Sequence, residues 1–444
     1  ANQRDIDRDT RRVSNKGRLG LRLDTYLDKD RKHHLELTGY GTIKYFERAS
    51  GVFRIINRYG LGASGRYILN YDAYGRNHEF SVGGDLLYQT GPIEYYNNIG
   101  GMRGENLSQI LVKTIGNSGA YFLNTFNLMP NKVDLLFTGR YETVYYDQKN
   151  QLSGVVDRRR SFENFTPKLA LNYKPLPATA IYTSIGQSFT SPASNELDNY
   201  PLSSDPNGLL NPDIKPQESI NFEIGIKSNS PYRGTRFFND YAAELTFFNS
   251  RIQKEIVPLE VFGEIFFRNA AESNRTGLEF GLNTGVFGPL RFEGAYTWSN
   301  FKYNSYTEQS IEFDDMFNQV IVERDFSGSF IPSIPKHNLA MNLSLSHRFN
   351  PAFTGFTRFG QRYISSLYVD DQNSDKTESY QLFNFTTGAD LVVGDYNLLF
   401  SAGLNNIFDV DHVAFVNINS ADARFFEAGE PRHFFLSLKL GYRP

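Results

Sequence analysis

The sequence predicts an all-β fold: a large antiparallel transmembrane β-barrel of the 22-stranded type. Three observations carry this prediction. Apolar and polar residues alternate with period two along most of the chain, and no segment has a convincing helical period. Many alternating segments run for about 11 to 16 residues, which exceeds the usual strand length of soluble proteins. The connections between them are short and long in turn, as in outer-membrane barrels.

The composition agrees with this fold and excludes several other classes of protein. The chain has 444 residues and no cysteine, which excludes disulfide scaffolds, thiolate zinc sites and cysteine nucleophiles. Its formal net charge of −3 argues against a nucleic-acid partner. No run of roughly 18 apolar residues exists, which excludes a transmembrane helix but not a membrane-spanning strand. The 38 Phe, 27 Tyr and 1 Trp suit the aromatic girdles of a barrel.

In chain order, the alternation predicts about 17 strands. They are 17–28, 33–49, 57–71, 77–90, 118–128, 133–146, 163–173, 177–188, 217–228, 240–251, 275–286, 289–301, 336–347, 353–367, 378–391, 395–407 and 434–443. Because successive strand side chains point to opposite faces, each segment has one apolar and one polar face. A half-exposed sheet in a soluble protein gives the same signal, so alternation alone does not decide between the two.

The rhythm of the connections favours the membrane barrel over a soluble sheet. Short connections are predicted near 72–77, 128–132, 174–176, 286–289, 348–352 and 393–395. Long polar connections are predicted near 91–117, 147–164, 189–216, 252–274, 301–336, 368–379 and 408–432. Outer-membrane barrels have tight periplasmic turns and long extracellular loops, whereas soluble sandwiches have no reason to keep long loops at one end.

An odd number of strands predicts that something is missing. Bacterial single-chain barrels have an even number, which keeps both termini in the periplasm. Counting loops back from the last strand places the polar stretch 1–16, which has no signal-peptide apolar region, outside the cell. We therefore expect a strand to be miscounted or, preferably, further strands to precede Ala1, without which the sheet does not close.

Two motifs resemble catalytic or cofactor sites only superficially. Residues 60–65 (GLGASG) have the glycine spacing of a dinucleotide-binding loop, but an alternating strand follows instead of a helix. We interpret them as close packing within a strand. His33 and His34 are neighbours on a strand and point to opposite faces, so they cannot chelate one metal together.

A third motif has the beginning of a calcium-loop spacing. Asp371, Asn373 and Asp375 fit it, but Lys376 stands where glycine is required, so we interpret the segment as a solvated loop. No other catalytic constellation is found in the sequence. We expect no enzyme activity, no cofactor and no resident metal.

Charged residues on the predicted inner face indicate a wide, wet barrel, because charges are costly in a dry core. They are Glu36, Lys44, Glu244, Glu279, Arg291, Glu293 and Lys439.

Several segments, in order along the chain, resemble a known family. They are 84–104, with Gly84-Asp85, Gln89, Asn98, Gly101 and Gly104; 181–197 (IYTSIGQSFTSPASNEL); 211–227 (NPDIKPQESINFEIGIK); 268–280 (RNAAESNRTGLEF); 403–409 (GLNNIFD); and 429–436 (GEPRHFFL). This series resembles the C-terminal barrel of TonB-dependent outer-membrane receptors, and 84–104 resembles the ferric-citrate branch. The chain departs from the family at Gln217-Glu218 and at Pro444, where the family usually ends on an aromatic residue.

The resemblance implies a protein of the bacterial outer membrane that imports a ferric siderophore or ferric citrate with TonB-derived energy. It implies a 22-stranded barrel around an N-terminal plug of roughly 150 residues. Residues 1–444 then form the C-terminal part of the barrel, without the plug and the first five strands. The implied partners are outer-membrane lipid with lipopolysaccharide, an iron chelate, and the TonB complex through the missing N-terminal region.

Two groups of residues are candidates for ligand binding. Arg158, Arg159 and Arg160 lie in a predicted long loop, where guanidinium groups suit an anionic chelate or a lipopolysaccharide phosphate. Tyr95, Tyr96 and Arg103 lie in the predicted 91–117 loop, where they would stack on and pair with a ligand. An ordinary solvated loop is the alternative interpretation of the arginine run.

Three other functions stay open at this stage. The substrate of a TonB-dependent importer can be cobalamin or a glycan. A passive porin-like channel has the same barrel pattern but no reason for the motif order. A soluble β-rich surface-binding protein has the alternation, but no reason for loops at one end only.

Overall fold

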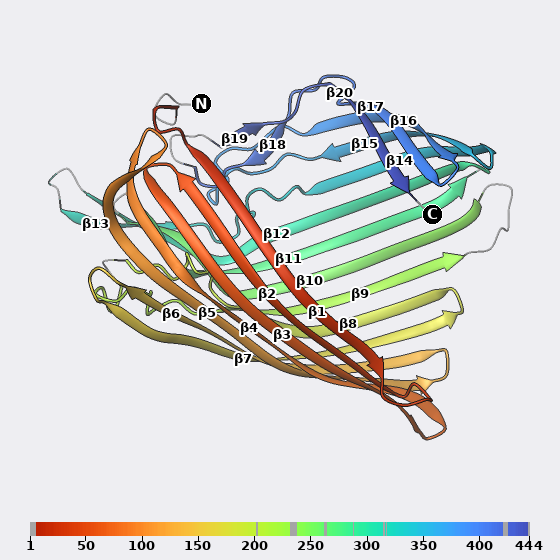
Figure 1. The fold of residues 1–444 in the computed structure, drawn as a ribbon, viewed down its shortest axis with the longest axis horizontal. Helices are drawn as coiled ribbons and strands as arrows, with labels where there is room; N and C mark the ends of the chain where they lie inside the picture. The colour runs from red at the N-terminus through yellow and green to blue at the C-terminus, as the bar shows by residue number, and fades with distance from the viewer. Residues whose placement is uncertain are drawn as a thin grey trace.

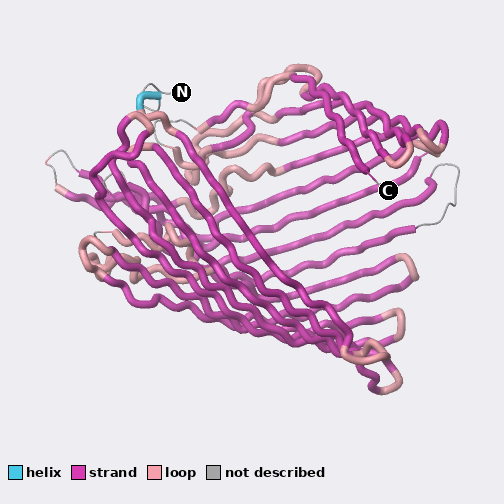
Figure 2. The backbone as a smooth tube through the Cα atoms, viewed as in Figure 1, coloured by secondary structure: helices cyan, strands magenta, loops and turns pink. Residues whose placement is uncertain are grey.

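The computed structural model describes residues 6–200, 203–230, 238–261, 264–286, 288–313, 316, 318–420 and 425–442. Long tilted strands make up nearly all of this part of the chain (Figure 2). Their main sheet curves into an open-sided shell, with the red to orange strands β1–β3 running diagonally across the front (Figure 1). No helix in these ranges has the length and apolarity that a membrane crossing requires.

The main sheet of the described residues has 18 strands, and all but β13 form the wall of the shell. These 17 wall strands (18 − 1) match the predicted strands one for one. The wall strands are β1 (Arg11–Tyr26), β2 (His33–Ala49), β3 (Val52–Ala73), β4 (Arg76–Ile99), β5 (Met102–Met129), β6 (Val133–Asn150), β7 (Val156–Leu176), β8 (Thr179–Thr190), β9 (Gln217–Ser230), β10 (Phe238–Val261), β11 (Glu264–Val286), β12 (Leu290–Phe313), β14 (His337–Asn350), β15 (Phe353–Ile364), β16 (Tyr380–Val393), β17 (Tyr396–Asn405) and β20 (His433–Tyr442).

Consecutive wall strands pair antiparallel from β1 to β20. β1 and β20 are the two edges, and within the described residues they do not pair with each other. The edges lie well apart, so the shell is open along one side (Figure 1).

The predicted loops need two corrections. Three short strands were missed: β13 (Gln319–Asp325) pairs with the outer end of β12, and β18 (Val413–Val416) pairs with β19 (Phe426–Ala428). The predicted loop 91–117 is instead mostly strand, with a turn at 100–101 between the paired strands β4 and β5, and the described part of 252–274 is also strand. Strand segments outside the membrane need not alternate apolar and polar residues, because their backbone groups are still satisfied by hydrogen bonds to the neighbouring strand. The polar composition of these segments therefore led to the wrong prediction of loops.

The outer face of the wall is apolar and unburied. Leu19 and Leu21 on β1 are 78% and 79% exposed. Apolar side chains also lie directly opposite one another across successive strands, in one register row. That row runs through Phe292, Leu343, Phe359, Phe385, Leu404 and Phe434. Such a band is the surface that faces lipid in a transmembrane barrel.

Candidate functional site

The opposite face of the wall lines the lumen and is polar. All seven charged residues predicted to point inward alternate with outward-facing apolar neighbours, as Glu36 does with the exposed Leu37 and Lys439 with the exposed Leu438 and Leu440. Ion pairs join many of these groups across strands: Arg358 Nη2 lies 2.7 Å from Glu293 Oε2, and Arg291 Nη1 lies 3.1 Å from Asp240 Oδ2. The prediction that charged residues line the inner face is confirmed.

One lumenal network crosses three strands through a glycine gap. Arg140 on β6 donates two hydrogen bonds to Asp85 on β4, at 2.7 and 3.0 Å, and one to Glu142 at 2.9 Å. Gly119 on the intervening β5 permits this reach, because a Cβ there would lie 2.3 Å from Arg140 Nη2. The bidentate geometry fixes the arginine against the wall.

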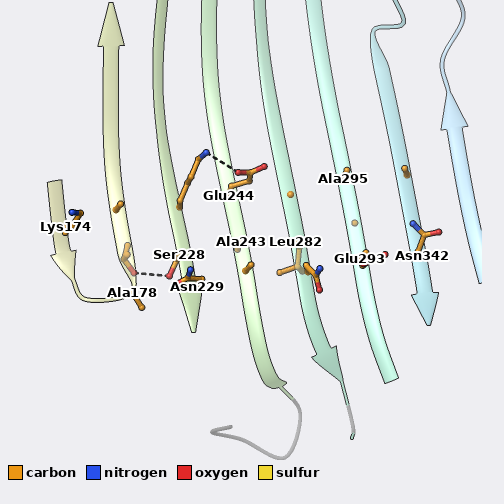
Figure 3. Close-up of a pocket in the computed structure, with 18 of the residues that line it drawn as sticks. Lys174, Ala178, Ser228, Asn229, Ala243, Glu244, Leu282, Glu293, Ala295 and Asn342 are labelled. Atoms are coloured by element: carbon orange, nitrogen blue, oxygen red, sulfur yellow. Dashed lines mark hydrogen bonds and ion pairs between the residues drawn. The ribbon is translucent and has the colours of Figure 1, made fainter. Parts of the chain in front are cut away.

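A shallow trough of about 670 Å³ lies on the lumenal face between β8 and β14 (Figure 3). Small residues floor it, among them Ala180, Ala242, Gly281, Ala295 and Ala340. Charged and amide side chains border it, and Lys227 Nζ lies 3.5 Å from Glu244 Oε2 (Figure 3). Because the residues in the trough are small and those around it are polar, another polypeptide segment could pack closely against this part of the wall.

At the end with the longer loops, the chain builds two buried cores of its own. The first rim core consists of Val144, Tyr146, Phe162, Leu197, Leu210 and Ile214. The described residues of the 191–216 loop (191–200 and 203–216) fold back here onto the lumenal side of β5–β7, where Tyr146 donates a hydrogen bond to the Pro192 carbonyl at 2.6 Å. Lys113 Nζ, 2.8 Å from Asp198 Oδ1, holds the same loop to β5.

The second rim core consists of Val257, Ala271, Tyr303, Tyr306 and Phe326. Tyr306 is fully buried, and its ring packs against those of Tyr303 and Phe326 at 4.9 and 5.4 Å. The Tyr303 hydroxyl donates to Asp371 Oδ1 at 2.7 Å, and Asn419 donates to Asp371 Oδ2 at 2.8 Å. Burial, with this carboxylate beside it, raises the pKa of Tyr303 above its ordinary value.

This network corrects the interpretation of 371–375 as a solvated loop. Asp371 is only 4% exposed and joins its own loop to strand β12 and to the loop of Asn419, because it accepts hydrogen bonds from Tyr303 and Asn419. Asn373 bonds the Phe330 backbone in both directions, at 2.7 and 2.8 Å. The spacing resembled a cation loop because both kinds of loop use side-chain oxygens to satisfy backbone N–H groups.

The predicted pair of tyrosines is divided between the two faces. Tyr95, Tyr96 and Arg103 lie in strands β4 and β5 and not in a loop. Tyr95 pairs in register with Arg54 on the lumenal face. Tyr96 faces outward, donates to Glu94 at 2.7 Å, and carries Arg103 over its ring at 5.0 Å.

The predicted arginine run lies at the start of β7, not in a loop. The Arg160 guanidinium donates to the carbonyls of Pro212 and Ile214, so it anchors the 191–216 loop. Arg159 is exposed, with its guanidinium 4.0 Å from the centre of the Tyr145 ring. The side chain of Arg158 lies outside the described residues.

The two motifs discounted in the sequence have structural roles. Residues 60–65 lie inside β3, as predicted. His33 contacts the Tyr67 hydroxyl at 2.5 Å, whereas His34 contacts Asp24 at 2.6 Å, so the two histidines serve opposite faces. Asp24, His34 and Glu36 are close enough to share a cation, but Arg22 already bonds both carboxylates.

Six basic residues lie on the lumenal face of β1–β3, and we call them the basic grid. They are Arg12, Lys16, Lys44, Arg48, Arg54 and Arg58. Only Lys44 among them was predicted from the sequence to point inward. All six have even residue numbers, so each lies on the same face of its strand. Arg12, Lys16 and Arg54 lie outside the predicted strands 17–28 and 57–71, so those strands as predicted could not bring the six together.

A family model described as TonB dependent receptor-like, beta-barrel, matches residues 2–407. The chain belongs to this family. It is a TonB-dependent receptor β-barrel of the bacterial outer membrane, and the apolar outer band is its lipid-facing surface.

Solved structures of similar fold include other receptors of this kind. The unliganded ferric citrate transporter FecA is 15% identical, with a TM-score of 0.76, and the match covers 97% of this chain and 62% of that one. The siderophore receptor PiuA from Acinetobacter baumannii is 16% identical, with a TM-score of 0.72, and the match covers 97% and 65%. The ferripyoverdine receptor of Pseudomonas aeruginosa, bound to ferripyoverdine, is 16% identical, with a TM-score of 0.63 and coverage of 95% and 56%. This TonB-dependent receptor barrel thus spans about three fifths of the length of these structures.

Proposed function

We propose that this TonB-dependent receptor barrel captures a ferric siderophore or ferric citrate at its extracellular side and imports it with TonB-derived energy. The observation that carries the proposal is the 191–216 loop, which is fastened to the lumenal wall by Arg160, Lys113 and the Tyr146 hydroxyl. A loop held over the lumen by buried contacts restricts free passage and presents a surface for a ligand.

The similar structures agree with this ligand class. Those proteins are a ferric citrate transporter, a siderophore receptor and a ferripyoverdine receptor. We extend that class to this chain because it has the same fold and a charged lumen. We also propose that it is a transport receptor and not an enzyme.

The remaining parts of the proposal concern the whole protein. We propose that residues 1–444 are the C-terminal part of a barrel preceded in the intact receptor by five strands, a plug and a TonB-contacting segment. Lipopolysaccharide would contact the outer band and rim. Reading the coding sequence upstream of Ala1 tests this, because a receptor requires a plug-like domain there.

Uptake by cells that carry the full gene is the deciding experiment. Labelled ferric citrate and ferric siderophores are supplied with and without a protonophore, and we expect accumulation that stops when the proton-motive force collapses. Uptake of labelled cobalamin or a glycan in place of iron would move the substrate to those classes. Energy-independent entry, with steady conductance in planar bilayers, would make the protein a passive channel instead.

A further inference from the structure

We propose that the 191–216 loop is a fixed strut of the receptor mouth and that three amide side chains, Asn211, Gln217 and Asn269, position it. We call these three residues the clasp. The loop stays fastened while a ferric chelate is captured and imported, so the ligand passes beside the loop and does not displace it. This role rests on the proposed uptake function and describes how one part of the mouth works within it.

The loop bridges a gap between two longer parts of the wall. It joins β8, which ends at Thr190, to β9, which begins at Gln217. On one side, β7 extends 12 residues (168 − 156) beyond Lys168, its outermost residue paired with β8. On the other side, β10 extends eight residues (261 − 253) beyond Gln253, its outermost residue paired with β9. The loop therefore has a longer strand on each flank to which it can be fastened.

On the β7 flank, the loop is held by apolar burial and by a guanidinium group. Leu197, Leu210 and Ile214 of the loop are buried in the first rim core. Arg160 on β7 donates to the backbone carbonyls of Pro212 and Ile214. Opening this flank would return three apolar side chains to water, which is unfavourable.

On the β10 flank, the loop is held at a β-bulge. The register of β10 against β11 shifts between Ile252 and Ile256, and Lys254 has a positive φ of 54° there. A bulge disrupts the ladder and leaves backbone groups without a strand partner. The Lys254 carbonyl accepts a hydrogen bond from Asn269 Nδ2 at 2.7 Å. The Ile256 N–H donates to Gln217 Oε1 at 3.2 Å, so side chains of the clasp satisfy the bulge.

The same side chains fasten the loop backbone. Asn269 Oδ1 accepts from the Lys215 N–H at 2.6 Å, and Asn269 Nδ2 donates to the Lys215 carbonyl at 2.8 Å. Asn211 is buried, donates to the Phe267 carbonyl at 3.0 Å and accepts from the Asp213 N–H at 2.9 Å. Amide side chains thus make the hydrogen bonds that a neighbouring strand would otherwise make.

Fastening on both flanks favours a strut over a gate. A loop held on one flank can swing about it, whereas the described residues of this loop (191–200 and 203–216) are held on two. A ligand reverses a 99:1 preference for the fastened loop only if it binds the released form roughly 10⁴-fold more tightly. A fixed loop instead presents its surface in the bound conformation, so binding does not have to order it.

The deciding experiment locks the loop in the full-length receptor. Lys215→Cys/Asn269→Cys replaces the amide clasp with a disulfide, and residues 1–444 contain no native cysteine that could compete. Cells with the oxidised variant should import labelled ferric citrate or a ferric siderophore at the wild-type rate. Import that stops on oxidation and returns after reduction would overturn the strut, because release of the loop would then be a step of import.

Removing the clasp tests its positioning role. Asn269→Ala should weaken binding of the imported ferric chelate to the purified receptor roughly fivefold, and the disulfide should restore it. Gln217→Ala removes one hydrogen bond and is a milder variant if Asn269→Ala folds poorly. The matched control is Asn249→Ala, because Asn249 on β10 donates two hydrogen bonds to Asn274 and Thr276 of β11 and not to the loop. Unchanged binding in Asn269→Ala would remove the positioning role.

Hydrogen exchange gives a readout that does not depend on import. The amides of 203–216 should be equally protected with and without ferric citrate or a ferric siderophore, less protected in Asn269→Ala, and unchanged in Asn249→Ala. Protection that falls when the chelate binds, in a receptor whose cells import it, overturns the strut and leaves the uptake function standing. Protection that depends on Asn269 in a protein whose gene supports no uptake supports the clasp and removes the importer function.

Discussion

The membrane-facing wall and the extracellular rim of this receptor barrel solve the burial of apolar side chains in opposite ways. In the wall, the protein leaves side chains such as Leu21 and Leu438 79% and 70% exposed, and they depend on lipid to cover them. In the rim, Leu197 and Tyr306 are fully buried by other parts of the chain. Period-two strands build both regions, but only the rim has a core in the sense of a soluble protein.

This difference separates the stability of the two regions. In the wall, lipid covers the apolar side chains, and hydrogen bonds between neighbouring strands satisfy the backbone N–H and C=O groups. The rim gains stabilisation from packing that loops bring back onto strand ends, and this packing persists in water. Mutations should therefore act on one region without the other, and that separation can be tested directly.

The largest effect is expected from emptying the second rim core. Tyr306→Ala removes a fully buried aromatic ring that packs against Tyr303 and Phe326, which should cost the rim about 3–5 kcal/mol. Hydrogen exchange should rise in 326–336 and 365–379, while the strands of the membrane band stay protected. Tyr74→Ala, at a turn position that is 98% exposed, is the control. Uniform exchange across wall and rim would show that the two regions are one cooperative unit.

A smaller effect, confined to the wall, is expected from a charge on the lipid-facing surface. Leu343→Arg places a cation in the apolar row of β14 and should cost about 2–4 kcal/mol in liposomes. Asn342→Arg is the control, because it points into the lumen opposite Glu293. Urea titrations of refolding into liposomes measure both. Equal losses for the two variants would contradict the assignment of faces.

The sequence predicted the wall far better than the rim. Alternation depends only on which face meets lipid, so all 17 wall strands and the inward position of Glu36 and Lys439 were predictable. The roles of Arg160 and Asp371 were not, because their partners lie 52 to 54 and 48 to 68 residues away, brought together by loop packing. The basic grid lies between these cases, since register places Arg48 beside Arg12 and Arg54, but Arg12 and Arg54 lie outside the predicted strands.

A still smaller effect should follow from loosening one polar contact within the rim. Asp371→Ala leaves the Tyr303 hydroxyl and the Asn419 amide without their acceptor, which should cost about 1–3 kcal/mol. Limited proteolysis should then cleave 365–379 faster, with cleavage of the wall strands unchanged. Asp375→Ala, at an exposed neighbouring position, should leave the rate unchanged. Equal acceleration by both variants would argue against the Asp371 network.

Ionisation of Tyr303 should have the smallest effect on stability at neutral pH. At alkaline pH it should destabilise the rim and not the wall. Burial and Asp371 raise the pKa of this tyrosine in the folded rim, whereas an unfolded tyrosine titrates near about pH 10. Tyr303 in the unfolded rim therefore loses its proton first, so its stabilisation of the folded rim is complete below about pH 10 and declines as the pH rises towards the folded pKa.

The single tryptophan, Trp298, lies on β12 five residues before Tyr303, and its fluorescence should report rim loosening above about pH 10. Tyr303→Phe should flatten this alkaline response while leaving the lipid-covered wall unchanged, because phenylalanine has no proton to lose. An identical alkaline response in Tyr303→Phe would place the titrating group elsewhere and remove this distinction between rim and wall.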